Sequence, residues 1–366
     1  MPLITRRRDG HPPAQRPETQ RREGEFAVCT RVIWPDAGGA VIVGRNMDNR
    51  RDLATNLWKL PRSVRRDGGL DGGLSWVARY GSVVATAYDV ITIDGLNEAG
   101  LAGHVLSLPE SAYGRRDQSR PALSQAVWLQ YFLDNFPSVA DAVAWMEDSR
   151  VQVVALAHPD TGERLAIHLA LEDATGDSAI VEYIDGRPEI HHSPDYRVVT
   201  NSPRYATQLK LLARIDGFGG DLSLPGTTRA PDRFARAWHY ARQLPSPRSQ
   251  SEAIASMLSV LRNTAQPARL PEAEGHPAPR TIWHSVLDLT ARRYVFASTT
   301  APGIVWVDLA DLDFEAGSGE EILDLARSHG STSTLVGDVS ALFERRGYLD
   351  FLRVEDDGRV AEGARR

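Results

Sequence analysis

Cys29 is the only cysteine among the 366 residues of the chain, and a lone cysteine has few chemical roles. It cannot form an intrachain disulfide, and metal sites built on sulfur usually need several thiolates. Two roles remain, a small buried hydrophobic residue or a nucleophile. Arg45 and Asp48 follow in the same segment. An arginine can favour a thiolate and a carboxylate can orient an amine, although such a pair alone could equally be a surface ion pair.

Two apolar runs predict a hairpin that would bring these residues together. Residues 29–34 (CTRVIW) and 38–45 (GGAVIVGR) are rich in β-branched side chains, and the intervening Pro-Asp-Ala-Gly-Gly has the composition of a turn. In an antiparallel hairpin, the start of the first strand lies near the end of the second. Cys29, Arg45 and Asp48 are therefore predicted to meet at one end of the hairpin.

Longer strings around these positions resemble the choloylglycine hydrolase family, whose members include penicillin V acylases and bile salt hydrolases. After CTR and GRNMD, the matching strings are TNLWKLPRSVRRDG, YGSVVATAYD, DGLNEAGLAGHVLSLPES, SAIVEYIDG, VVTNSP and LPGTTRAPDRF. The resemblance runs from residue 29 to about residue 310 and is strongest to the penicillin V acylase-like branch found mostly in Gram-negative bacteria. It implies an N-terminal nucleophile hydrolase with an α+β fold, a four-layer αββα sandwich of two stacked antiparallel sheets flanked by helices.

The resemblance also implies roles for particular residues. These are Cys29 as nucleophile, Arg45 and Asp48 as its neighbouring pair, Asn201 as an oxyanion donor, Arg233 as a second active-site arginine, and the backbone N–H of Ser107 as the other oxyanion donor. No metal or organic cofactor is expected. Taken singly, Asn201 could be an ordinary turn residue before Ser-Pro, and Arg233 could lie on a solvated helical face. Because all of these residues occur together at the spacing of the family, an active site is the favoured interpretation.

The implied chemistry agrees with elementary acid–base arguments. A thiol with a pKa near 8.5 is mostly protonated at neutral pH and needs a base or a cationic setting. If Cys29 is residue one, its α-amine, with a reference pKa of about 7.7 to 8.0, can accept that proton. Attack on an amide then forms a thioester, which releases an amine first and a carboxylic acid second. Preorganised donors stabilise the oxyanion that develops on the carbonyl oxygen.

Two other functions stay open on the sequence alone. One is a non-catalytic small-molecule-binding protein of the same fold that never exposes Cys29. The other is a peptidase-like or acyl-transfer enzyme that pairs Cys29 with one of the ten histidines.

Two departures from the branch concern the substrate. Asn49 and Ser107 occupy positions where aromatic residues, usually tryptophan, are typical of the branch, so we expect both to contact substrate in a pocket with less aromatic surface. The expected ligand is a small N-acyl amide. The smaller aromatic surface weakens the case for penicillin V as the preferred substrate, and aliphatic acyl chains, including those of N-acyl homoserine lactones, become candidates beside penicillin V and conjugated bile acids.

The segment before Cys29 has a different composition. Residues 1–28 are rich in arginine and proline and lack an apolar run of seven, so they predict a disordered leader rather than a normal signal peptide. We expect either loss of this prosegment or a true translation start at Val28. The second alternative is favoured, because a GTG codon can initiate with methionine, which is trimmed before a small residue.

Composition is typical of a globular chain, with 42% hydrophobic residues, 25% charged residues and a net charge of −6. The sequence has no clustered basic face of the kind that binds nucleic acid, and it has no apolar stretch of 18 residues that could span a membrane.

We expect one amidohydrolase domain over residues 29–350 and a charged tail over 351–366. The family resemblance implies a homo-oligomer, possibly a homotetramer. We expect a cytoplasmic location, or a periplasmic or secreted one if the true N-terminus carries a signal peptide.

Periodicity predicts blocks of strands and helices. Strands are predicted at residues 151–157, 165–171, 178–184, 196–200, 281–287, 294–298 and 303–309. Helices are predicted at 123–136, at 138–147 with Ser138 as N-cap, and at 252–262.

Overall fold

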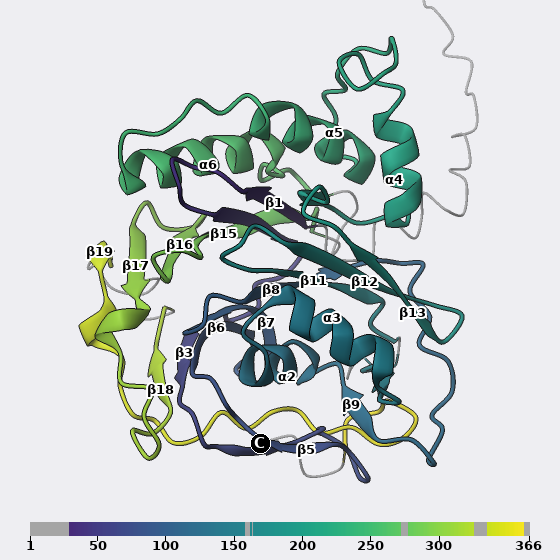
Figure 1. Cartoon of the computed structure of the whole chain (residues 1–366), viewed down its shortest axis with the longest axis vertical. Coiled ribbons are helices and arrows are strands. Elements are labelled where there is room, and N and C mark those ends of the chain that lie inside the picture. Colours follow the sequence, from purple (N-terminus) through teal and green to yellow (C-terminus); the bar gives the residue numbers. More distant parts are fainter. Residues whose placement is uncertain (1–28, 158–161, 163, 272–276, 326–334, 362–366) are drawn as a thin grey trace, which may run out of the picture.

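The computed structural model describes residues 29–157, 162, 164–271, 277–325 and 335–361, so the expectations for residues 1–28 lie outside the described residues. Two large, mainly antiparallel sheets lie face to face, and helices cover their outer faces (Figure 1). The predicted α+β sandwich with αββα layers is confirmed.

The first sheet has seven strands, and the hairpin that carries Cys29 lies near one of its edges. Their order is β14 (Val198–Val199), β1 (Thr30–Trp34), β2 (Ile42–Asn49), β15 (Arg280–Asp288), β16 (Arg293–Ser298), β17 (Ile304–Asp308) and β19 (Gly337–Asp338). Its outer face is covered by α5 (Ala230–Ala241) and α6 (Gln250–Thr264), with α4 (Tyr205–Leu212) beside α5.

The second sheet has eight strands. Their order is β13 (Arg187–His192), β12 (Ser178–Ile184), β11 (Ile167–Glu172), β8 (Ala102–Ser107), β7 (Ile91–Asn97), β6 (Ser82–Ala87), β3 (Leu57–Leu60) and β18 (Glu321–Leu323). Helices α2 (Trp128–Asn135) and α3 (Val139–Asp148) pack on its outer face.

Smaller elements complete the described part. They are the strand pair β4 (Arg65–Asp67) and β5 (Ser75–Val77), the pair β9 (Ala122–Ser124) and β10 (Gln152–Val154), and the 3-10 turns η1 (Leu309–Asp311) and η2 (Ser340–Leu342). Among the described residues, no helix has the length and apolar character needed to cross a membrane.

Both faces of a central strand such as β6 are largely apolar because each face packs on another layer. In β6, Val83 and Ala85 join the core between the sheets, whereas Val84 points to the opposite face and packs under α2 and α3. Side chains alternate along a strand, so a sheet covered on both faces needs apolar residues at successive positions. This is why β6 (SVVATA) has a mostly apolar sequence.

The hairpin expected at residues 29–45 is present, with Thr30 opposite Asn46 and Trp34 opposite Ile42. Ser138 caps α3, and its hydroxyl accepts the Asp141 N–H at 3.2 Å, as predicted.

The helix predicted from residue 123 is wrong in its first part. Residues Ala122–Ser124 form β9, which pairs in parallel with β10, and α2 begins only at Trp128. Because β9 is also buried, its apolar side chains continue the helical spacing of α2 towards the N-terminus, so the pattern predicts a helix that begins too early.

The segment after residue 350 is bonded to the body of the domain. Leu352 donates its N–H to the Val90 carbonyl at 2.9 Å, and Val354 donates to Gly69 at 2.8 Å. Residues 351–361 therefore lie against the domain, with isolated bridges at Val354 and a turn at residues 356–358.

Candidate active site

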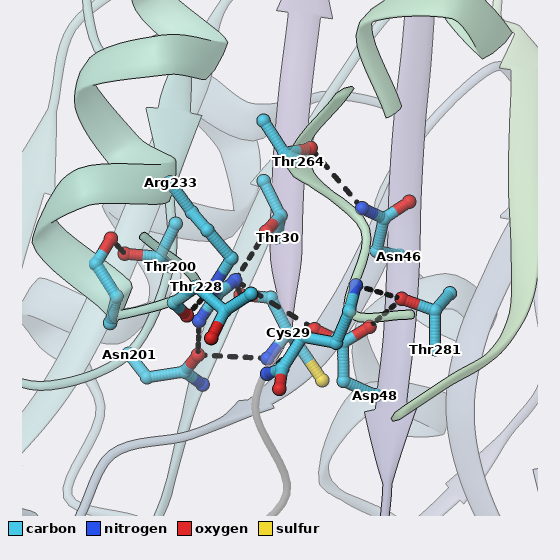
Figure 2. Close-up of polar contacts among 12 residues, drawn as sticks. Cys29, Thr30, Asn46, Asp48, Thr200, Asn201, Thr228, Arg233, Thr264 and Thr281 are labelled. Carbon is cyan, nitrogen blue, oxygen red and sulfur yellow. Dashed lines mark hydrogen bonds and ion pairs between the residues drawn. The ribbon is translucent and has the colours of Figure 1, made fainter. Parts of the chain in front are cut away.

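Cys29 lies immediately before β1, buried at the end of the hairpin (Figure 2). Its Sγ is 3.5 Å from the Met47 Sδ and 3.8 Å from Arg45 Nη2. Its backbone N–H donates to Asn201 Oδ1 at 2.8 Å. The sulfur and the backbone nitrogen of one residue therefore each face a separate polar partner.

Strand alternation divides the surroundings of Cys29 into two sides. Odd-numbered side chains of the hairpin point to the second sheet, as Arg45 does towards Asp94 at 3.2 Å. Even-numbered side chains point to the helices, as Asn46 does in donating to the Leu261 carbonyl of α6 at 2.9 Å. The odd positions at the site are Cys29, Arg45 and Met47, and the even positions are Thr30, Asn46 and Asp48.

Arg45 is fully buried between the sheets and held on several sides. Its guanidinium donates to the carbonyls of Ile93 and Val105 and pairs with Asp94. Burial lowers the pKa of Arg45, but the negative charges of Cys29 and Asp94 outweigh it and raise the pKa above its ordinary value. Arg45 therefore presents a permanent positive charge to the Cys29 sulfur.

Asp48 lies on the helix side and is also fully buried. It accepts a hydrogen bond from Thr281 Oγ1 at 2.5 Å and from Gln266 Nε2 at 3.5 Å, and it faces Arg233 Nη1 at 3.8 Å. Burial raises the pKa of Asp48 to about 6, although Arg233 and the two hydrogen bonds oppose the shift. Asp48 therefore changes charge close to the pH range in which an enzyme works.

Arg233 in the first turn of α5 is the centre of the helix-side network. It donates to the Cys29 carbonyl at 2.6 Å, to Thr30 Oγ1 at 2.5 Å and to Asn201 Oδ1 at 2.8 Å. Burial lowers its pKa, and Asp48 and Cys29 oppose that shift. The solvated helical face considered for Arg233 is wrong, because this face of α5 packs on β1.

Asn201 follows β14 and joins the two sides of the site. Its Oδ1 accepts from Cys29 and Arg233, while its Nδ2 donates to the Ser107 carbonyl at 2.7 Å. The loop is fixed by the buried Gln208 of α4, whose Nε2 donates to the carbonyls of Asn201 and Pro203. A turn residue alone would not need this set of buried contacts.

Ser107 ends β8, and strand geometry fixes the direction of its N–H. The next residue, Leu108, donates its N–H to the Ala166 carbonyl at 2.9 Å, on the side of β11. Backbone groups of successive residues in a strand point to opposite sides. The Ser107 N–H therefore points away from β11, to the side where its carbonyl meets Asn201.

Asn49 is less directly connected to this centre. Its Oδ1 accepts from the backbone N–H groups of Arg50 at 2.7 Å and Arg51 at 3.4 Å, so the side chain is turned back on its own chain. It lies two positions after Met47 in β2, and alternation places both on the same side of the strand. The structure thus brings six of the seven predicted positions into one bonded cluster and leaves Asn49 beside it.

Several neighbours of the site were not predicted from the sequence. Met47 could have been found, because in the hairpin register Thr30 pairs with Asn46 and the next position along lies opposite Cys29. Thr281 and Gln266 could not have been found in this way, since they follow Asp48 by more than 200 residues and reach it only through the pairing of β15 with β2.

Comparison with known proteins defines the class of protein to which this fold and site belong. The model of linear amide C–N hydrolases, choloylglycine hydrolase family, matches residues 29–324. The chain belongs to this family and is a hydrolase of linear amide C–N bonds.

Particular relatives agree with the predicted penicillin V acylase-like branch. The chain is 38% identical over 315 residues to a penicillin V acylase of Pectobacterium atrosepticum, covering 80% of this chain and 84% of the relative. The solved structure of penicillin V acylase from Agrobacterium tumefaciens is 40% identical, covers 89% of this chain and all of its own, and has a TM-score of 0.79.

A more distant likeness concerns the fold alone. The structure of a mutant conjugated bile acid hydrolase from Clostridium perfringens has a TM-score of 0.69 at 19% identity, covering 81% of this chain and 95% of its own.

Proposed function

We propose that this hydrolase acts through Cys29 as an N-terminal nucleophile and cleaves small N-acyl amides by way of a thioester. The observation that carries the proposal is the pair of contacts at Cys29, where the backbone nitrogen meets Asn201 at 2.8 Å and the sulfur meets Arg45 at 3.8 Å. A buried cysteine with only a packing role needs neither contact.

The first half of the reaction transfers the acyl group. The Cys29 thiol gives its proton to its own α-amine, and Sγ attacks the carbonyl carbon of the substrate. Arg45 stabilises the thiolate, and Asp48 on the helix side stabilises the ammonium. When the C–N bond breaks, the ammonium returns the proton to the leaving nitrogen, so an amine departs and an acyl thioester remains.

The oxyanion is held by two donors in this proposal. The Asn201 carboxamide has two N–H groups, and one is fixed on the Ser107 carbonyl at 2.7 Å. The other is thereby oriented near the Ser107 N–H, which points to the same side. In the second half, water attacks the thioester with the same α-amine as base, and the carboxylic acid is released.

A cysteine–histidine mechanism receives less support. Within the part of the chain that the structure describes, the hydrogen bonds of Cys29 involve Asn201, Arg233, Met47 and Arg45, and no histidine. The base is therefore assigned to the α-amine of Cys29.

The test of the function is a panel of N-acyl amides of varied chain length and head group, with mass spectrometry of both products and of the enzyme. We expect one amine and one carboxylic acid per turnover, an enzyme mass that begins at Cys29, and a transient mass increase equal to the acyl group. Turnover by a species that retains residues before Cys29 would contradict the proposal.

Substrate preference is proposed to favour aliphatic acyl chains over the phenoxyacetyl group of penicillin V, because Asn49 and Ser107 supply no aromatic surface. Asn49→Trp should raise the phenoxyacetyl to linear-acyl ratio of kcat/KM by about 2- to 10-fold, the range for one aromatic contact of about 0.5 to 1.5 kcal/mol. Asn49→Leu adds apolar surface without a ring and is the matched control. An unchanged ratio in Asn49→Trp would remove Asn49 from the acyl site.

We expect the loss of activity at low pH, the acid limb of the pH profile, to follow protonation of Asp48. Asp48 acts as an anion, so activity falls as pH drops through its pKa of about 6. Thr281→Val removes a hydrogen bond to that anion, raises the pKa of Asp48 further, and should move the acid limb of kcat/KM to higher pH by up to about one unit. Thr299→Val is the control, since the Thr299 hydroxyl donates to the Thr281 and Ile282 carbonyls and not to Asp48. If the acid limb of kcat/KM lay at the same pH in both variants, the limb would belong to a titrating group other than Asp48.

Assembly into a homo-oligomer, including the tetramer implied by the family resemblance, also stays a proposal. Light scattering of the purified enzyme measures it directly.

A further inference from the structure

A line of five alternating charges runs through the interior between the two sheets and ends at the nucleophile. The line is made of Arg45, Asp94, His104, Glu172 and Arg31, and all five side chains are fully buried. Successive members are 3.2, 2.7, 2.6 and 3.2 Å apart. Such a line is costly to bury, because each charge must be taken out of water.

The topology explains how the line forms. Arg31 and Arg45 are directly opposite each other in the hairpin of the first sheet, an arrangement that is unfavourable for like charges without counter-ions. Asp94, His104 and Glu172 come from the adjacent strands β7, β8 and β11 of the second sheet, where Asp94 is opposite His104. The line thus crosses from sheet to sheet at both of its ends.

The geometry makes His104 an imidazolium. Its Nδ1 lies 2.7 Å from Asp94 Oδ2, and its Nε2 lies 2.6 Å from Glu172 Oε1. A neutral imidazole has a single N–H and would set a lone pair against one of these carboxylates. The pKa of His104 agrees, because burial lowers it but Asp94 and Glu172 outweigh burial and raise it.

The line contains three cations and two anions, so one positive charge is left over. Asp94 shares its oxygens among His104, Tyr294 (2.5 Å) and Ser285 (3.1 Å) as well as Arg45, and therefore neutralises Arg45 only in part. Arg45 Nη2, which also donates to the Val105 carbonyl and to Met47 Sδ at 3.3 Å, is the nitrogen that faces the Cys29 sulfur at 3.8 Å.

The other charges near Cys29 are paired with each other. Asp48 and Arg233 face each other on the helix side at 3.8 Å, and they compensate one another. In the described part of the chain, the charged or titratable groups bonded to these two carboxylates besides His104 are Arg31, Arg45 and Tyr294.

We propose that His104 is a positioning residue for the nucleophile: as an imidazolium bonded to the same Asp94 oxygen as Arg45, it takes up part of the Asp94 charge and leaves more of the Arg45 charge to the Cys29 thiolate. The proposal rests on the proposed role of Cys29 and adds an electrostatic support that lies outside the site cluster. It predicts that removing a charge at His104 or Glu172 changes the pH at which the Cys29 thiol ionises. Removal of a cation raises that pH, and removal of an anion lowers it.

Alkylation tests this directly, because Cys29 is the only cysteine and each label reports one site. The rate of modification of the purified enzyme by iodoacetamide is followed against pH by intact mass. His104→Gln removes a cation and should move the midpoint to higher pH by about one unit, the scale of a nearby charge change. Glu172→Gln removes an anion and should move it to lower pH. The carboxamide oxygen introduced by Glu172→Gln can still accept the His104 Nε2–H.

The double variant His104→Gln/Glu172→Gln restores the original charge count and should return the midpoint towards that of the parent. Opposite shifts with partial restoration support the proposal, because general loosening of the core would move both single variants in the same direction. Shifts of the same sign, or no shift in either variant, would overturn it. If His104→Gln does not fold by circular dichroism, the required result is the shift of Glu172→Gln to lower pH, and an unshifted midpoint overturns the proposal.

This outcome is separable from the proposed function, since alkylation does not require amide hydrolysis. Hydrolysis that survives Cys29→Ala would remove the nucleophile assignment, whereas an unshifted alkylation midpoint would remove only the role of His104.

Discussion

Replacing Cys29 with alanine is expected to lower kcat for amide hydrolysis by about 1,000-fold or more, with no loss of folded structure. Removal of a nucleophile abolishes the covalent route, and what remains comes from oxyanion donors and binding alone. The residue is small and buried beside Met47, so alanine leaves the packing largely intact. Release of the carboxylic acid from the best substrate of the panel measures the effect, and thermal unfolding checks the fold.

A second variant separates the α-amine mechanism from its competitor. An uncleavable residue placed before Cys29 keeps the sulfur and removes the free amine, and we expect a loss close to that of Cys29→Ala. A cysteine–histidine enzyme would tolerate this extension. Retention of more than about a tenth of the activity by the extended enzyme would transfer the role of base to another group.

Asn201→Ala is expected to lower kcat by about 100- to 1,000-fold with a much smaller change in KM, which is the usual effect of losing one oxyanion donor. In the proposed mechanism, the Asn201 carboxamide makes a contact that strengthens only when negative charge develops on the substrate oxygen. Steady-state kinetics on a slow and a fast substrate separate kcat from KM.

Asn97→Ala is the matched control for this variant. Asn97 is a buried asparagine whose Oδ1 accepts backbone N–H groups in its own turn, including that of Leu101 at 2.9 Å, and whose Nδ2 donates to the carbonyl of Leu133. Its loss should reduce stability by about 1 to 3 kcal/mol and leave kcat nearly unchanged. Equal kcat values in the two variants would show that Asn201 acts only through the fold.

The sequence allowed prediction of the parts of the site that depend on local geometry. The β1–β2 hairpin follows from alternating apolar runs and a turn, and this hairpin alone places Arg45 beside Cys29. The capped start of α3 follows from Ser138. These features rest on residues close together in the chain, so periodicity and turn chemistry are sufficient.

Long-range features needed the resemblance or the structure. Arg233 reaches Cys29 across 204 residues, and nothing in its helical surroundings distinguishes it from a solvated side chain. The start of α2 was placed too early because burial of β9 continues the apolar pattern of the helix. The line from Arg45 to Arg31 was not foreseen, since its members come from both sheets and become neighbours only when the sheets stack.

The opposed faces of the hairpin have a practical consequence for protein engineering. In the proposed mechanism, proton transfer at the nitrogen depends on residues under the helical layer, such as Asp48 and Arg233, whereas sulfur reactivity depends mainly on Arg45 between the sheets. Libraries confined to α5 and the loop after α6 are therefore expected to act mainly on the pH optimum, and libraries in β7 and β8 mainly on thiol reactivity. The nitrogen and the sulfur of Cys29 can thus be engineered through different parts of the fold.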